Sequence, residues 1–149
     1  MYEEPQENND LFFTCSLIEY IARKTKNTKK YIISKLGKQN ITKIYTLASI
    51  YHTENINKIA DEFINKSNIK NGNYDITSTC IYKIPTYFEI GKVYKRLIIM
   101  VNSNKEKYVD TLITVLSSWI IEKIDNYNSS MYYENPNYIY ECYKAGKII

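Results

Sequence analysis

The chain has 149 residues, of which 44% are hydrophobic, and its formal net charge at pH 7 is +4. This length suits one domain with a sizeable core, and the apolar content excludes wholesale disorder. No apolar run approaches the roughly 18–20 residues that a membrane-spanning helix needs. The three cysteines, Cys15, Cys80 and Cys142, are too far apart in sequence for a disulfide framework, so we expect a protein of the reducing cytoplasm.

The composition favours helices. The chain contains only four glycines and three prolines, and turns of a many-stranded sheet would need more. Tyr, Asn, Lys and Ile are abundant, and all four have AT-rich codons. A genome of low GC content would explain much of this abundance without a functional role.

The N-terminal half predicts a tail followed by four helices. Residues 1–9 are polar and acidic, so we expect a flexible tail that is not a secretory signal. Asp10 can cap a helix that begins at Leu11. Helical spacing of apolar side chains and suitable cap residues predict three further helices, at 28–36, 39–51 and 54–66.

The segment 70–85 differs from its surroundings. Asn71-Gly72-Asn73 is typical of a turn. The residues that follow mix β-branched and polar side chains, which fits a long ordered loop or one short strand pair. We expect a loop that separates two helical halves sharing one core.

The second half begins with a helix over 86–101. Thr86 and Glu89 match a capping box, in which each side chain accepts a hydrogen bond from the backbone of the other. Gly91 lies on the inner face of this helix, where the missing side chain would allow another helix to approach closely.

The longest amphipathic pattern covers 105–127, and neither Pro nor Gly interrupts it. Its apolar residues, Trp119 among them, recur every three or four positions and predict one long helix, with Asp125 on the solvent face. A short turn separates it from the preceding helix, so the two should form an antiparallel hairpin. Asn135 and Pro136 predict the start of a last short helix. The sequence thus predicts an all-α, single-domain bundle of six or seven helices around this central hairpin.

Between Arg23 and Lys43 every charged residue is basic. Such a stretch can neutralise the phosphates of a nucleic acid or attract an acidic protein partner, or it can be a solvated lysine face. A helix-turn-helix around Gly37 fits less well, because its second helix carries few donors for base edges.

Two further groups are candidates for binding. One is the pair Lys92 and Arg96, whose basic side chains point outward together on the 86–101 helix. The other is the C-terminal tyrosines, which could stack on bases, anchor a protein partner or simply cover the core. The candidate binding surface therefore comprises Arg23, Lys24, Lys26, Lys29, Lys30, Lys35, Lys38, Lys92, Arg96, Tyr132 and Tyr133.

No pattern in the sequence predicts catalysis, a cofactor or a metal. Phosphate-binding loops need clustered glycines, which the sequence lacks. His52 is the only histidine. Its spacing to the cysteines matches neither a nucleophile–histidine pair nor a set of zinc ligands. We expect a protein that is not an enzyme.

One motif resembles a known group of proteins. Phe13-x-Cys15-x-x-Ile18-Glu19-Tyr20, followed some thirty residues later by Tyr51-His52, is similar to the pattern of small bacterial helical proteins encoded beside ADP-ribosyltransferase-like toxins. The resemblance covers about residues 11–64, and the second half of the chain has no counterpart. It implies a helical accessory protein, such as an antitoxin-like partner, and it implies no catalytic residues.

The leading hypothesis is therefore a non-catalytic protein-binding module, possibly antitoxin-like or an accessory protein of a mobile element. The alternative is a nucleic-acid-binding protein that uses the stretch from Arg23 to Lys43. An enzyme is the third possibility.

Overall fold

The computed structural model describes residues 4–149, and all regular secondary structure in this range is helical. The predicted all-α bundle is confirmed. In these residues the chain forms eight α-helices and two short 3-10 helices: α1 (Gln6–Thr25), α2 (Lys29–Thr46), α3 (Ala48–Tyr51), α4 (Ile56–Lys66), α5 (Tyr87–Val101), η1 (Lys105–Lys107), α6 (Tyr108–Leu116), α7 (Ile120–Asp125), η2 (Met131–Tyr133) and α8 (Pro136–Ala145).

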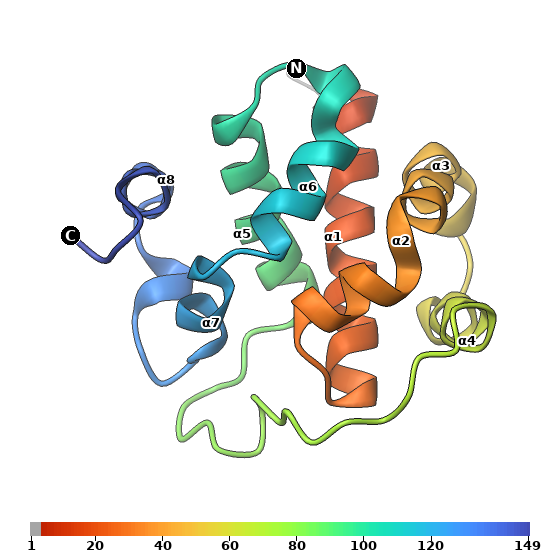
Figure 1. The fold of residues 1–149 in the computed structure, drawn as a ribbon, viewed down its shortest axis with the longest axis horizontal. Helices are drawn as coiled ribbons and strands as arrows, with labels where there is room; N and C mark the ends of the chain where they lie inside the picture. Colours follow the sequence, from red (N-terminus) through yellow and green to blue (C-terminus); the bar gives the residue numbers. More distant parts are fainter. Residues whose placement is uncertain (1–3) are drawn as a thin grey trace.

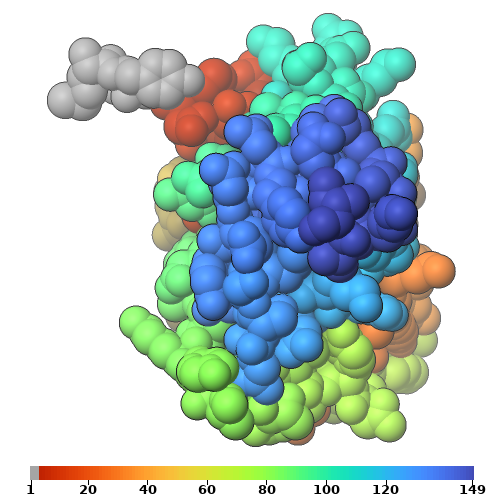
Figure 2. Space-filling model, turned by 90° about the vertical axis from the view of Figure 1, so that its left-hand side faces the viewer, coloured from red at the N-terminus to blue at the C-terminus, as the bar shows by residue number. Residues whose placement is uncertain are grey.

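Helix α1 occupies the middle of the molecule (Figure 1). It packs most extensively against α5 and also contacts α2, α3 and α4. Its side chains Leu11, Leu17 and Ile18 have no exposed surface. Figure 2 shows that the C-terminal segment, drawn in blue, covers the middle of one face of the molecule. The helices of the expected hairpin, α5 and α6, contact each other, but α1 makes the most extensive helix contacts in the bundle, and α6 packs mainly against α2 and α5.

The segment 105–127 is not one helix but three pieces. Helix α6 ends at Leu116, and α7 begins at Ile120. Between them, the Ser118 hydroxyl donates to the Val115 carbonyl at 2.6 Å, a local bond that competes with continued helical hydrogen bonding. The break rotates α7 relative to α6, so Trp119 is only partly buried and Asp125, expected to face solvent, is buried.

The expected flexible tail is wrong for residues 6–9, which form the first turn of α1. Pro5 precedes the helix at the N-cap position, and Glu7 places a negative charge in the first turn, where the helix dipole favours it. Asp10 thus lies inside the helix rather than at its start. Residues 4 and 5 precede the helix, and residues 1–3 of the predicted tail lie outside the described residues.

Several predicted helix starts are confirmed. The Thr28 side chain accepts a hydrogen bond from Tyr31 N at 3.1 Å, and Thr86 and Glu89 form the expected capping box. Asn135 caps α8, with proline at the next position. Gly37, expected to end the helix at 28–36, has a φ of 71° and non-helical geometry, so α2 consists of two helical segments that meet at a kink there.

Gly91 allows the close approach of α5 to α1 that the sequence predicted. A Cβ atom built on Gly91 would lie 2.1 Å from Ser16 Oγ and 3.0 Å from Ser16 Cα. Of the described residues, Ser16 also has the only buried side-chain oxygen or nitrogen without a hydrogen-bond partner. The two helices therefore touch at their backbones, and no larger residue fits between them.

The segment 70–85 contains neither helix nor strand, which agrees with the expected loop. It crosses one end of the molecule between α4 and α5 (Figure 1). Backbone hydrogen bonds tie it to the end of α1: Gly72 N donates to the Thr25 carbonyl at 2.8 Å, and Tyr74 N donates to the Lys26 carbonyl at 2.9 Å. The helices before and after this loop contribute to one continuous hydrophobic core.

Candidate functional site

The basic stretch that begins at Arg23 does not form one continuous positive surface. Lys24, Lys26 and Lys38 each reach a carboxylate from another part of the chain, and these pairs remain partly or largely exposed. Their acidic partners are Asp61, Asp75 and Asp110, respectively. Exposed pairs of this kind contribute little to stability, but they neutralise the charge that a phosphate would otherwise meet.

Lys29 was predicted to lie on the binding surface, and that prediction is wrong. Its side chain has 0% exposed surface, and its Nζ lies 2.6 Å from Asp125 Oδ1 and 2.9 Å from Glu19 Oε1. The Arg23 Nε, mostly covered, lies 2.7 Å from Glu19 Oε2. Two cations and two carboxylates thus form a buried ion network with balanced charge, which joins α1, α2 and α7.

Three tyrosines complete this network. The Tyr94 hydroxyl lies 3.2 Å from Glu19 Oε1, the Tyr127 hydroxyl donates to Glu19 Oε2 at 2.9 Å, and the Tyr74 hydroxyl donates to Asp125 Oδ2 at 3.1 Å. Burial raises the pKa of all three phenols, so they remain protonated donors. Loop 70–85 and helix α5 are therefore tied to the same charged centre.

Burial and charge act in opposite directions on the ionised groups of the network. Burial alone would raise the pKa of Glu19, but Lys29 and Arg23 outweigh it and hold that pKa well below its ordinary value. Burial would lower the pKa of Lys29, but Glu19 and Asp125 raise it. For Asp125 the burial effect prevails and its pKa is raised. Each charged side chain is satisfied within the protein, so the network is a structural element and offers no free group for chemistry.

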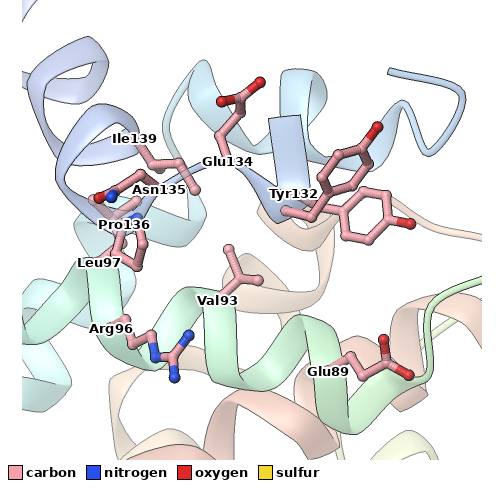
Figure 3. Close-up of a pocket in the computed structure, with 10 residues that line it drawn as sticks. Glu89, Val93, Arg96, Leu97, Tyr132, Glu134, Asn135, Pro136 and Ile139 are labelled. Atoms are coloured by element: carbon pink, nitrogen blue, oxygen red, sulfur yellow. The ribbon is translucent and has the colours of Figure 1, made fainter. Parts of the chain in front are cut away.

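Four of the remaining candidate residues, Lys92, Arg96, Tyr132 and Tyr133, belong to α5 and η2. A cleft of about 310 Å³ lies between α5 on one wall and η2 with the start of α8 on the other. Figure 3 shows Val93 of α5 and Tyr132 of η2 on opposite sides of this cleft, with Pro136 and Ile139 farther along it. Its lining is thus largely apolar and aromatic.

Charged and aromatic side chains also line this cleft, among them Glu89 on α5. Arg96 lines it, and Lys92 is exposed one turn earlier on α5. Tyr133 also lines it and leaves 68% of its surface exposed. The Glu134 carboxylate accepts a hydrogen bond from the Ser130 hydroxyl at 2.6 Å and points away from α5 (Figure 3).

Neither Arg96 nor Lys92 has an ion-pair partner among residues 4–149. Of the basic stretch, Lys30 and Lys35 on α2 are likewise exposed and lack such a partner in that range. The predicted surface therefore divides into three parts: the buried or neutralised side chains of 23–29 and 38, two free lysines on α2, and the cleft lined by Arg96, with Lys92 one turn away from it.

The described residues contain no cluster of His, Cys, Asp and Glu that could hold a metal ion. Burial raises the pKa of the Cys15 thiol, which keeps it protonated and unreactive. His52 is exposed, and its Nδ1 contacts the Ala48 carbonyl at 3.1 Å. Nor does any helix within 4–149 have the length and apolar character that crossing a bilayer requires.

Sequence reasoning missed Glu19 and Asp125 as partners of Lys29. One feature could have revealed the first: Glu19 stands in an otherwise apolar stretch, Leu17-Ile18-Glu19, of a helix expected to be deeply packed. A carboxylate at such a position needs a buried cation. Asp125 gave no comparable indication, because a regular helix over 105–127 places it on the solvent face.

No protein-family model matches the chain, and neither a curated protein nor a solved structure is significantly similar to it. The resemblance of residues 11–64 to toxin-associated bacterial proteins therefore stays a prediction.

Proposed function

We propose that the protein is a non-catalytic binding module that holds a segment of a partner protein in the cleft between α5 and η2–α8. The observation that carries this proposal is the combination of Arg96 with Tyr132 and Tyr133 around an apolar floor. Arg and Tyr are the side chains most enriched at energetically important positions of protein interfaces.

The chemistry of the cleft describes the segment that it would accept. An apolar side chain of the partner would rest against Val93 and Ile139, which line the cleft. A carboxylate on the same segment would pair with Arg96, whose planar guanidinium can donate two parallel hydrogen bonds. Lys92, one helical turn away, would add attraction at longer range. Because Glu89 also lines the cleft, the expected partner segment is apolar and carries a carboxylate only where it meets Arg96.

A photo-crosslinking residue placed at Tyr133 tests this proposal in the native host. We expect one protein to be captured from that position and not from Lys35, an exposed control position on α2. Arg96→Ala should abolish the capture, and Arg96→Lys should retain only part of it, because a lysine lacks the bidentate fork. Equal capture from both positions, or capture that ignores Arg96→Ala, would refute the cleft as the binding site. The antitoxin-like or mobile-element role stays a prediction that the identity of the captured protein would test.

Nucleic-acid binding remains the alternative, but fewer basic side chains are available for it than the sequence indicated. Lys26 and Lys29 have carboxylate partners, whereas Lys30, Lys35 and Lys43 of α2 have none among residues 4–149. Lys30 and Lys35 both precede the kink at Gly37. If these two contact duplex DNA, replacing both by Gln should flatten the dependence of log affinity on log salt by about two units. Absence of binding at low salt would exclude this alternative. Lys29 must be left intact in this test, because it is part of the buried network.

A further inference from the structure

A second cavity, separate from the cleft, lies against α1. Its volume is about 580 Å³, and it is bounded by the first half of α1, the end of α3, the start of α4 and the first turn of α5. Cavities of roughly 300–1,000 Å³ are the usual size for small-molecule sites. Phe13 and Ala48 are its most deeply buried lining residues, so the cavity reaches the hydrophobic core.

The cavity has an aromatic wall. Phe12, Tyr87 and Phe88 all line it. The ring centroids of Phe12 and Phe88 are 6.0 Å apart, and those of Tyr87 and Phe88 are 4.4 Å apart. Phe88 nevertheless leaves 47% of its surface exposed, which is unusual for a phenylalanine with aromatic neighbours on both sides. The Lys95 ammonium lies 5.8 Å from the centroid of the Phe12 ring, so one face of that ring is already covered, and Phe88 offers the most exposed ring to an incoming group.

The charge of the cavity is opposite to that of the protein. The chain carries a net charge of +4, yet the lining contains Asp10 and Glu54 and neither lysine nor arginine. Among residues 4–149 neither carboxylate takes part in an ion pair, and Asp10 Oδ1 accepts only a neutral hydrogen bond, from Gln6 at 2.7 Å. Two unneutralised carboxylates beside aromatic faces are complementary to an organic cation.

Three further polar residues, Gln6, Asn9 and His52, line the cavity, and His52 can contact a ligand through its ring. Its Nδ1 lies 3.1 Å from the Ala48 carbonyl, which can only accept, so Nδ1 carries a proton. In the neutral ring Nε2 is then an acceptor. His52 can therefore receive a hydrogen bond from an ammonium group, as the two carboxylates can.

We propose that this cavity binds a small organic cation, in which an apolar body lies against Phe12, Tyr87 and Phe88 and an ammonium group pairs with Asp10 and Glu54. This site is independent of the cleft that Arg96 lines, and its ligand is a small molecule rather than a protein segment.

Three probes that share one apolar body test the proposal: 4-phenylbutylamine, 4-phenylbutanol and 4-phenylbutyrate. They carry a positive, a neutral and a negative head group, respectively. Binding is followed by titration calorimetry and by chemical-shift changes of the full-length protein. We expect the amine to bind at least about tenfold more tightly than the alcohol, and the carboxylate not to bind, because the head group alone changes the charge complementarity.

Variants then locate the binding. Glu54→Gln and Asp10→Asn should each weaken amine binding by about three- to tenfold and leave alcohol binding unchanged. Phe88→Ala should weaken both, and the control Lys35→Gln should change neither. Far-UV circular dichroism checks that each variant folds. An alcohol that binds as tightly as the amine, an amine that does not bind at millimolar concentration, or binding that ignores both acidic substitutions would overturn the proposal.

Discussion

Replacing Lys29 by Met removes the cation that stands between two buried carboxylates. The ammonium has no exposed surface and lies within 3 Å of both Asp125 and Glu19, at 2.6 and 2.9 Å. Without it, Arg23 remains as the only cation for two buried negative charges. Breaking a buried pair on one side costs about 3–5 kcal/mol, because the remaining charge is left uncompensated. Against a total stability of about 5–15 kcal/mol for a domain, this loss is large.

Urea denaturation followed by far-UV circular dichroism measures the effect on the free energy of unfolding. Lys35→Met is the matched control, because Lys35 lies on the same helix but is exposed, and substitutions at such positions usually change stability by no more than about 0.5 kcal/mol. A second variant separates lost charge from lost packing. Adding Asp125→Asn to Lys29→Met removes a carboxylate that has lost its cation, so part of the stability should return.

Two results would refute this reasoning. One is a loss below about 1 kcal/mol for Lys29→Met, the range of an exposed ion pair rather than a buried one. The other is a double variant less stable than the single variant, which would mean that Asp125 stabilises the fold through neutral hydrogen bonds rather than through Lys29.

Three further predictions concern the helix contact, a helix start and alkaline pH. Gly91→Ala should destabilise the protein by about 1–3 kcal/mol through overpacking against Ser16, and combining it with Ser16→Gly should recover part of the loss in the same urea assay; full stability of Gly91→Ala alone would disprove the close contact. Thr86→Ala should cost about 1 kcal/mol by removing the capping box, and an unchanged urea midpoint would contradict this. Burial raises the folded-state pKa of Tyr94 and Tyr127 above the ordinary tyrosine value. Their contribution to the free energy of unfolding is therefore complete below about pH 10 and is lost as the pH rises through the folded-state pKa values. The loss is up to about 1.4 kcal/mol per pH unit for each group. Phenolate absorbance should therefore appear together with unfolding. Ionisation of all tyrosines in a folded protein would refute this pH dependence.

The all-helical class, the loop at 70–85 and most helix starts followed from local features of the sequence. Thr28, Thr86 and Asn135 cap their helices through side-chain contacts within three residues, so a single stretch of sequence contains all the information. Gly91 was also identified correctly, because a glycine on an otherwise apolar helix face has few explanations other than close packing.

The identity of the central helix and the composition of the binding surface could be determined only from the tertiary structure. An apolar periodicity predicts a helix, but it does not show where two serines will interrupt it, as they do at Ser117 and Ser118, or which of several amphipathic helices becomes the core.

Lys29 illustrates the same limit for charge. In sequence it is one lysine among many in a basic stretch, and only the fold brings it to Asp125, which is 96 positions away. Local periodicity determines which residues form a helix, because those hydrogen bonds join near neighbours. Burial and ion pairing of side chains depend on which distant helices meet, so only the tertiary structure decided that Lys29 is part of the buried network, whereas Arg96 remains free to bind.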